Sequence, residues 1–277
     1  MMKREEMLEF EVNQLLEAIN FRYGYDFRDY ARASIERRIL NRVQLSDLNS
    51  VSEMLPKIMH DQAFFDLFLR DMSVTVTEMF REPSVFKVIR EAVFTQLKTY
   101  SRVNIWHAGC ATGEEVYSMA IMLKEEGLLD KTRLYATDYN NHSLEIAEKG
   151  IYPAQKIKLF TKNYLEAGGR GSFADYYLAK FNSAIMSDSL KKHITFANHN
   201  LMKDQCFAEM HLIVCRNVLI YFNRQLQNRV FQLFKESLIP RGFLLLGDKE
   251  TLEFSTVADS FEHFSEKEKI YRRLIYV

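Results

Sequence analysis

The stretch VNIWHAGCATGEEVYSMAIML, at residues 103–123, constrains the fold of this chain more than any other part of it. It begins as an apolar run typical of a buried strand and ends with the apolar spacing of an amphipathic helix. The turn between them contains only small residues, so its backbone can approach a ligand closely beside the free N–H groups of the helix start. Phosphate is the usual ligand of such a turn, but Glu114 and Glu115 follow at once and would repel it. We therefore expect a neutral or cationic ligand that carries hydroxyl groups.

From about residue 100 onward, the sequence alternates between predicted strands and helices. Strands are predicted at 103–109, 132–138, 193–200, 210–217, 243–248 and 269–277, and helices at 113–126, 142–149 and 224–238. This alternation indicates the α/β class with a doubly wound, mostly parallel sheet, and the pattern of the last strand indicates an antiparallel one. The stretch 151–192 follows neither pattern and is interpreted as an insertion.

The N-terminal part of the chain is of a different kind, because it contains no convincing strand and no cluster of Gly or Pro. Its apolar residues recur at helical spacing: Leu8, Val12, Leu15, Leu16, Ile19, Ile35, Ile39, Val43, Phe64, Phe65, Phe68 and Leu69. We predict a small all-helical domain over residues 1–75, followed by the α/β domain over residues 76–277.

One predicted helix of this N-terminal domain carries a row of arginines. Arg32, Arg38 and Arg42 lie within roughly one face, interleaved with Ile35 and Ile39. Two interpretations stay open. The arginines either flank a buried apolar stripe with their long side chains, or they form a docking face for an acidic partner.

Charge and cysteine content narrow the function classes. Lys plus Arg and Asp plus Glu both number 37, so the overall charge does not favour nucleic acid as a partner. Cys110, Cys206 and Cys215 lie far apart and the His residues form no H-E-x-x-H motif, so we expect neither disulfides nor a metal site. No apolar run resembles a signal peptide or is long enough to insert into a membrane. We expect a cytoplasmic monomer.

An acidic residue at the end of the second predicted strand limits the classes of ligand that the site can bind. Ligands of a doubly wound sheet bind at the carboxyl ends of its strands, where Asp138 can accept both ribose hydroxyls of an adenosine. The turn Gly109-x-Ala111-x-Gly113 lacks the G-x-G-x-x-G fingerprint, which argues against a nicotinamide oxidoreductase. S-adenosylmethionine has a ribose and a sulfonium cation but no phosphate, and fits better. The alternatives are that Glu115 only meets the helix dipole and that Asp138 only caps the next helix.

Five stretches, in order, extend over nearly the whole chain and match one family: TEMFREP, WHAGCATGEEVYSMAI, YATDYN, ANHNL and, most specifically, VCRNVLIYF. The chain resembles the chemotaxis-receptor glutamate methyltransferases, the CheR family. The resemblance implies a Rossmann-like domain that uses S-adenosylmethionine, with a small inserted β-subdomain at about residues 168–197. It also implies that the helical domain docks onto the cytoplasmic helical region of chemotaxis receptors. There, glutamate side chains would become methyl esters, with S-adenosylhomocysteine as the second product.

The resemblance also assigns roles to residues of this chain. Arg81 and Tyr221 are the implied catalytic residues, and Arg32, Arg38 and Arg42 fit the docking role. The implied cofactor-binding residues are Thr75, Thr77, Arg81, Gly109, Glu115, Asp138, Asn200, Leu201, Arg216 and Asn217. Many members have Asn where this chain has Thr75, which puts a hydrogen bond at that position in doubt.

The implied reaction requires few catalytic groups. A glutamate acceptor has a free pKa of about 4.3 and is already ionised at neutral pH, so no general base is required. Arg81 can hold that carboxylate with two parallel hydrogen bonds, and Tyr221 can orient it. The structural alternatives are a surface pair of Arg81 with Glu82, and a core position for Tyr221 beside Phe222. The functional alternatives are a non-catalytic cofactor-sensing or scaffold module, and a methyltransferase of the same fold with another substrate.

Overall fold

The computed structural model describes residues 4–73 and 77–275. The chain divides into two compact units. The first, called the helical unit below, contains Met1–Val74 together with Tyr221–Arg229; the second, called the sheet unit, contains Thr75–Ile220 and Val230–Val277. The return of the segment 221–229 to the helical unit is a long-range pairing, and the local sequence pattern does not predict it.

Among the described residues, the N-terminal part of the helical unit contains four helices: α1 (Arg4–Tyr23), α2 (Arg32–Leu45), α3 (Met54–His60) and α4 (Gln62–Met72). The apolar spacing predicted α1, α2 and α4 but singled out no residue of α3. Nearly all of the residues that carry this spacing are buried, among them Val12, Ile39 and Phe68 at 0% exposure. The start of α4 is fixed by Asp61, whose carboxylate accepts the backbone N–H of Phe64 at 3.1 Å. The predicted all-helical N-terminal domain is confirmed.

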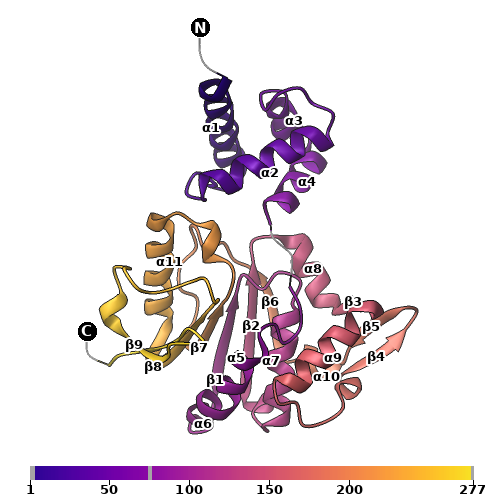
Figure 1. Cartoon of the computed structure of the whole chain (residues 1–277), viewed down its shortest axis with the longest axis vertical. Coiled ribbons are helices and arrows are strands. Elements are labelled where there is room, and N and C mark those ends of the chain that lie inside the picture. The colour runs from indigo at the N-terminus through magenta and orange to yellow at the C-terminus, as the bar shows by residue number, and fades with distance from the viewer. Residues whose placement is uncertain (1–3, 74–76, 276–277) are drawn as a thin grey trace. The chain divides into compact units, whose positions relative to one another are not determined.

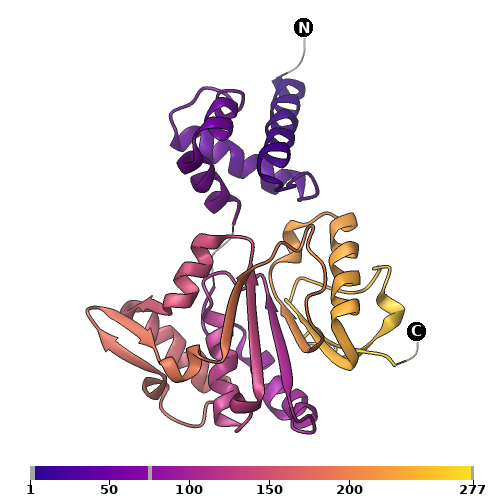
Figure 2. The same ribbon diagram turned by 180° about the vertical axis from the view of Figure 1, so that it is seen from behind.

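The main sheet of the sheet unit has the strand order β6-β2-β1-β7-β8-β10-β9 (Figures 1 and 2). Its strands are β1 (Val103–Ala108), β2 (Thr132–Asp138), β6 (Ile194–Asn198), β7 (Met210–Cys215), β8 (Leu238–Leu246), β9 (Phe261–Ser265) and β10 (Ile270–Arg273). Neighbours from β6 through β8 pair in parallel, whereas β10 runs antiparallel to both β8 and β9. The predicted mostly parallel sheet with an antiparallel last strand is confirmed.

Helices cover both faces of this sheet. The helices after residue 76 are α5 (Pro83–Val88), continued by a π-helical turn at Ile89–Val93 and by α6 (Phe94–Leu97), then α7 (Glu114–Glu125), α8 (Asn141–Lys149), α9 (Ile157–Glu166), α10 (Asp188–Lys191) and α11 (Arg224–Ser237). Of these, α9 packs against α5, and α10 packs against α7. Adjacent residues of β1 point to opposite faces. Ile105 is buried in the same cluster as the apolar residues of α7. The Trp106 ring lies on the other face, 5.5 Å from that of Phe234 in α11.

A small second sheet has the order β3-β5-β4 and is wholly antiparallel, with β3 at Ile151–Pro153, β4 at Tyr177–Lys180 and β5 at Ser183–Met186. Figure 1 shows it projecting beside the end of the main sheet where β6 lies. The inserted β-subdomain was expected at about 168–197, but its first strand lies earlier, and residues 194–197 belong to β6 of the main sheet. A strand of three residues is too short to show an alternating pattern, which is why β3 escapes prediction.

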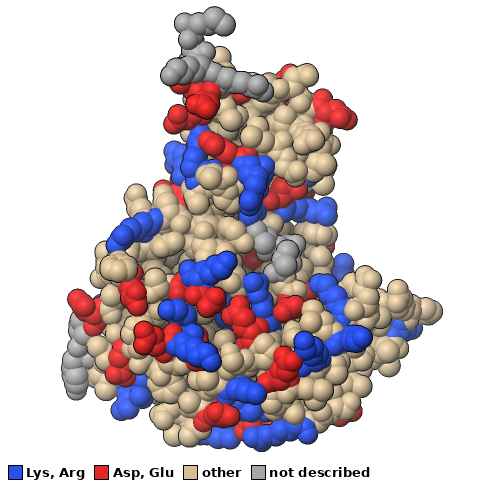
Figure 3. Space-filling model, in the orientation of Figure 1, with Lys and Arg blue, Asp and Glu red and all other residues tan. Residues whose placement is uncertain are grey.

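Positive and negative side chains are mixed on the face of the sheet unit that Figure 3 shows. Figure 3 shows Lys and Arg beside Asp and Glu over the visible face of this unit, with neither sign gathered into one field. Among the described residues, no helix has the length and apolar character needed to cross a bilayer. The described residues also contain no group of three or more His, Cys, Asp or Glu side chains that could bind a metal ion.

Candidate active site

The glycine turn follows β1 and is pinned to the end of β2. The N–H groups of Gly109 and Cys110 donate to the carbonyl of Thr137 at 2.8 and 2.9 Å. Gly109 has φ +74°, and a Cβ atom there would come within 2.5 Å of a methyl group of Val218. Only glycine meets both demands, so this residue lets the turn after β1 pack against the turn after β7.

Asp138 lies at the carboxyl end of β2, beside this turn. Its carboxylate accepts the N–H of Ala111 and the N–H of Asn140, both at 2.9 Å. Burial raises the pKa of the Asp138 carboxyl, against these two N–H donors, which lower it. The side chain of Asn140 caps α8, so Asp138 is not needed as the helix cap that the sequence left open. It is a half-buried carboxylate held by the backbone N–H groups of Ala111 and Asn140.

The end of β6 brings Asn200 to the same edge of the sheet. The N–H of His199 donates to the carbonyl of Asp138 at 3.2 Å, which joins the two strand ends. Asn200 is 3% exposed, and its side-chain oxygen accepts the N–H of Met202 at 3.0 Å. Its side-chain nitrogen is buried and has no hydrogen-bond partner among the described residues. Leu201 is also buried. A buried donor without a partner beside an apolar residue suits the nitrogen-rich edge of an adenine ring.

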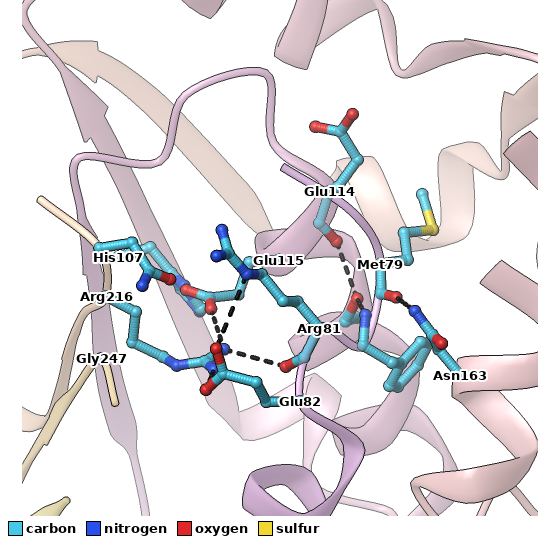
Figure 4. A network of polar contacts seen from close by, with 12 residues as sticks. Met79, Arg81, Glu82, His107, Glu114, Glu115, Asn163, Arg216 and Gly247 are labelled. Carbon is cyan, nitrogen blue, oxygen red and sulfur yellow. Dashed lines mark hydrogen bonds and ion pairs between the residues drawn. The ribbon is translucent and has the colours of Figure 1, made fainter. Parts of the chain in front are cut away.

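Arg216 follows β7 and connects three distant segments of the chain (Figure 4). Its guanidinium lies 2.7 Å from a carboxylate oxygen of Glu115 and 2.6 Å from one of Glu82, and it donates to the carbonyl of Arg81 at 3.2 Å. Only 1% of the Arg216 side chain is exposed. Such a charge is tolerated inside a protein only when it is paired. The two carboxylates therefore fix the TEMFREP segment and the start of α7 against the turn after β7.

Glu115 remains an anion at the first turn of α7. Burial by itself would raise its pKa, but Arg216 and His107 outweigh it and lower the pKa to about 2. The His107 ring nitrogen Nδ1 lies 3.3 Å from the other carboxylate oxygen. Glu115 therefore not only interacts with the dipole of α7 but also binds Arg216 and His107. Glu114 differs: its side chain points away from the network in Figure 4 and accepts the hydroxyl of Thr112 at 2.6 Å.

Arg81 has a fixed backbone and a largely unengaged side chain. On one side of it, the N–H of Phe80 donates to the Ser118 hydroxyl at 2.9 Å, and Asn163 donates to the carbonyl of Met79 at 3.0 Å. The Arg81 side chain is 37% exposed, and its Nε lies 3.7 Å from Glu82, a loose ion pair. The described residues provide no second ion pair for it. Its guanidinium is available for a carboxylate, as its predicted role requires.

A carboxylate that the sequence reasoning missed shapes the turn after β7. Glu250 is 4% exposed and accepts four backbone N–H groups at 3.0 Å or less. The donors are Asn217, Val218, Leu219 and Gly247. Local sequence gives no signal for this role, because three of the four donors lie some thirty residues upstream. Glu82 and His107 were missed for the same reason.

The other predicted site residues lie as follows. Thr75 falls outside the described residues, and Thr77 is half-buried in the coil before Met79. Asn217 begins the turn held by Glu250 and has φ +60°. Tyr221 belongs to the helical unit, where its ring lies 5.1 Å from the guanidinium carbon of Arg38. Phe222, its neighbour, is the buried aromatic residue of the pair.

All three arginines of the predicted docking row have partners inside the helical unit. Arg32 contacts Glu36 at 2.6 Å and Asn13 at 2.5 Å, Arg38 donates to two carbonyls at the end of α4, and Arg42 pairs with Asp71. Ile35 and Ile39 between them are buried. These contacts support the structural interpretation, and the docking role stays a prediction.

The fold and the site together define a class of protein. A doubly wound sheet with a glycine turn after β1, an acid ending β2 and a buried unpaired amide after β6 is the framework of a Rossmann-like methyltransferase that uses S-adenosylmethionine. Residues 75–270 match the family model described as CheR methyltransferase, SAM binding domain, and residues 11–73 match CheR methyltransferase, all-alpha domain. The chain belongs to the CheR methyltransferase family.

Two relatives match this chain over most of their own length. A protein named Cher3 from Pseudomonas putida is 47% identical over 272 residues, which cover 98% of this chain and 100% of that protein. The chemotaxis protein methyltransferase of Listeria innocua is 29% identical over 83% of this chain and 85% of its own length. A solved N-methyltransferase, NodS from Bradyrhizobium japonicum, covers 62% of this chain and 63% of its own with a TM-score of 0.35, too distant for a comparison of sites.

Proposed function

We propose that this protein is a protein-glutamate O-methyltransferase that forms methyl esters on the cytoplasmic helical region of chemotaxis receptors. The observation that carries the proposal is the state of Arg81. Its backbone is bonded to the network of Arg216, while its guanidinium has only a loose partner at 3.7 Å. A planar guanidinium of this kind is suited to two parallel hydrogen bonds with a carboxylate. The name of the Listeria relative supports a chemotaxis protein as the substrate.

The residues at the strand ends suit the parts of S-adenosylmethionine. Asp138 would accept the ribose hydroxyls, as the acid at this place does in related folds. The free amide donor of Asn200 would meet the adenine. Glu115, an anion, would attract the amino group of the methionine part. Arg216 has a buried Nε without a partner among the described residues, a donor for the cofactor's carboxylate. The remaining proposed lining residues are Thr77, Gly109, Leu201 and Asn217, together with Thr75, which lies outside the described residues.

S-adenosylmethionine supplies a methyl group on a cationic sulfur, which an ionised carboxylate can attack without a base. The protein's task is therefore to align the acceptor and to exclude water. Alignment of this kind lowers barriers by as much as roughly 7–11 kcal/mol in favourable cases. Transfer erases the negative charge of the acceptor, so a very tight ion pair with Arg81 would stabilise the ground state and slow the reaction. A partly exposed arginine is a better aligner than a buried one.

The helical unit is the part that we propose for docking onto receptor helices. Arg32 keeps 39% of its side chain accessible, against 12% for Arg42. Tyr221 is proposed to orient the acceptor or the reacting methyl group through its hydroxyl, which has no hydrogen-bond partner among the described residues of the helical unit.

The experiment that tests the proposal follows a labelled methyl group. The protein is incubated with methyl-labelled S-adenosylmethionine and the cytoplasmic fragments of candidate receptors, and the labelled product is then treated with mild alkali. Methyl esters release labelled methanol, whereas N-methyl groups keep their label. Receptor fragments with glutamine in place of their surface glutamates are the control. Label that survives alkali would overturn ester formation, and binding of S-adenosylhomocysteine without any transfer would indicate a non-catalytic module.

A further inference from the structure

The segment that contains Tyr221 is tied to the start of α2 by backbone hydrogen bonds. The N–H of Ala31 donates to the carbonyl of Tyr221 at 2.8 Å, and the N–H of Asn223 donates to the carbonyl of Asp29 at 2.7 Å. The side chains of Asn223 and Asp29 form a further hydrogen bond at 3.0 Å. Residues separated by about 190 positions thus pair like two short strands, and they hold the backbone of Tyr221 in one place.

Aromatic packing holds the same segment from the side. Tyr30 and Phe222 form an isolated antiparallel bridge, and their rings lie 5.1 Å apart in an edge-to-face arrangement. Both are nearly fully buried, at 8% and 6% exposure. Edge-to-face pairs of this kind are favourable beyond the area that they bury. Phe222 therefore serves as the apolar anchor beside Tyr221.

Among the residues that the structure describes, Arg38 is the charged residue whose side chain lies over the Tyr221 ring. Its guanidinium carbon lies 5.1 Å from the ring centroid, within the range of a cation–π contact. The same guanidinium donates to the carbonyls of Asp71 at 3.0 Å and Met72 at 2.7 Å. These carbonyls belong to the last turn of α4, where helix carbonyls lack partners within the helix and attract cations. The end of α4 therefore holds the guanidinium in place over the tyrosine ring.

The chain on the other side of Tyr221 is also held. Within the sheet unit, Glu250 accepts the N–H groups of Val218 at 2.8 Å and Leu219 at 2.7 Å. Tyr221 follows this turn after one intervening residue, Ile220, whose N–H lies 3.4 Å from the same carboxylate. The backbone is thus constrained before and after Tyr221, which leaves the ring orientation to be set by the side chains around it.

We propose that Arg38 is a positioning residue that orients Tyr221 for methyl transfer, rather than a residue that docks the receptor. The inference rests on the proposed function, because it assigns Tyr221 a part in the transfer step. Nη1 of Arg38 is engaged by the two carbonyls of α4 and its guanidinium lies over the Tyr221 ring, so the group is held where it supports the ring. Arg37, the next residue of α2, is exposed and has no recorded partner among the described residues, which makes it the matched control.

Steady-state kinetics separate positioning from docking. Arg38→Met should lower kcat by roughly 5- to 30-fold, the equivalent of a cation–π contact of about 1–2 kcal/mol, and leave KM for the receptor within about twofold. Arg38→Lys keeps the charge but loses the planar contact, so its kcat should fall between those of Arg38→Met and wild type. Arg37→Met should match the wild type. A raised, salt-sensitive KM with unchanged kcat in Arg38→Met would overturn the proposal in favour of docking.

A double-mutant cycle tests whether Arg38 acts through Tyr221. Tyr221→Phe keeps the ring and removes the hydroxyl that we assign to the transfer step. Adding Arg38→Met to Tyr221→Phe should cost little further activity, because the orientation of a ring without its hydroxyl no longer matters. If the two losses simply multiply, Arg38 acts independently of Tyr221 and the proposal fails.

A nuclear magnetic resonance measurement that does not depend on methyl transfer tests this inference separately from the proposed function. In protein with isotope-labelled tyrosine, the ring resonance of Tyr221 is assigned by its loss in Tyr221→Phe. Arg38→Met should shift that resonance and Arg37→Met should not. An unmoved resonance in folded Arg38→Met would overturn the support of the ring by Arg38, whether or not receptors are methylated. A wild-type protein that forms no ester while the resonance shifts as expected would overturn the catalytic role and the proposed function, with the contact itself upheld.

Discussion

Arg216 shows how single residues build this site. It is a buried cation between two carboxylates, and each partner comes from a different part of the chain. Removing one partner would leave charge without compensation, which is far more costly than loss of an exposed ion pair. By contrast, Asp138 ends a predicted strand and Glu115 lies in the first turn of a predicted helix, which is why the sequence alone could single them out. Glu82 and His107 have no such mark, since only the folded chain brings Glu82 to Arg216 and His107 to Glu115.

The role of Asp138 leads to a prediction about cofactor affinity. Asp138→Ala should weaken binding of S-adenosylhomocysteine by about 1.5–3 kcal/mol, the range for hydrogen bonds to a charged group. Isothermal calorimetry measures the affinity. Asp130→Ala is the control, because that side chain is 98% exposed. Equal affinities in a folded Asp138→Ala and in the wild type would remove Asp138 from the cofactor site.

Arg81 gives a prediction that separates acceptor from cofactor. Arg81→Lys keeps the charge but cannot form two parallel hydrogen bonds with a carboxylate. The transfer rate should fall by at least an order of magnitude, roughly the energy of one charged hydrogen bond, while affinity for S-adenosylhomocysteine stays near wild type. Arg102→Lys, at an exposed position, serves as the control. Loss of product affinity in step with rate would instead assign Arg81 to the cofactor's carboxylate, and full activity would leave it a structural residue.

At the scale of elements, the periodicity of the sequence located most of the sheet unit. The predicted strand at 132–138 is β2, and the predicted helix at 224–238 differs from α11 by one residue at its end. The apolar pattern of each of these elements extends over its whole length, so the local sequence is sufficient to predict it. The three-residue β3 has none, and the pairing of the segment 221–223 with residues 29–31 joins distant parts of the chain. Neither could be predicted, because both depend on contacts that no local pattern records.

The turn after β7 yields a prediction about stability. Glu250→Gln replaces a carboxylate that accepts four short N–H bonds by an amide with one acceptor oxygen and an NH₂ group that faces other donors. Urea unfolding should show a loss of at least about 2 kcal/mol, since buried donors lose a charged partner. Glu253→Gln, at an exposed position in the same loop, should change the unfolding free energy little. A Glu250→Gln protein as stable as the control would show that the turn does not depend on this carboxylate.

At the scale of the whole molecule, stability should depend on pH through Glu115. Its pKa is lowered from the ordinary 4.5 to about 2 by Arg216 and His107, against the effect of burial. A depressed folded-state pKa contributes stability that is present above the unfolded value and is lost as pH falls toward the folded one. The difference in unfolding free energy between wild type and Glu115→Gln should therefore be large at pH 6 and shrink between about 4.5 and 2. A difference that stays constant over this range would contradict the ionised pair with Arg216.

The division into two units also explains why the roles of residues could be predicted from the sequence but their contacts could not. The motif TEMFREP lies in the sheet unit, whereas the motif VCRNVLIYF begins in the sheet unit and continues into the helical unit at Tyr221. Family resemblance supplied the roles of Arg81 and Tyr221, whereas the contacts of Tyr221 with Arg38 came only from the fold. Physical reasoning from the sequence thus reached the cofactor and the reaction class but not the partners that orient the side chains.

Mass spectrometry of the methylated receptor is the decisive measurement. A receptor cytoplasmic fragment is incubated with the protein and S-adenosylmethionine that carries a deuterated methyl group, then digested and sequenced by fragmentation. We expect the labelled methyl on glutamate side chains of receptor helices, lost on mild alkaline treatment and absent when those glutamates are replaced by glutamine. A labelled methyl found on lysine, on another nitrogen or on a small molecule, and none on glutamate, would contradict the assignment of this chain as a glutamate O-methyltransferase.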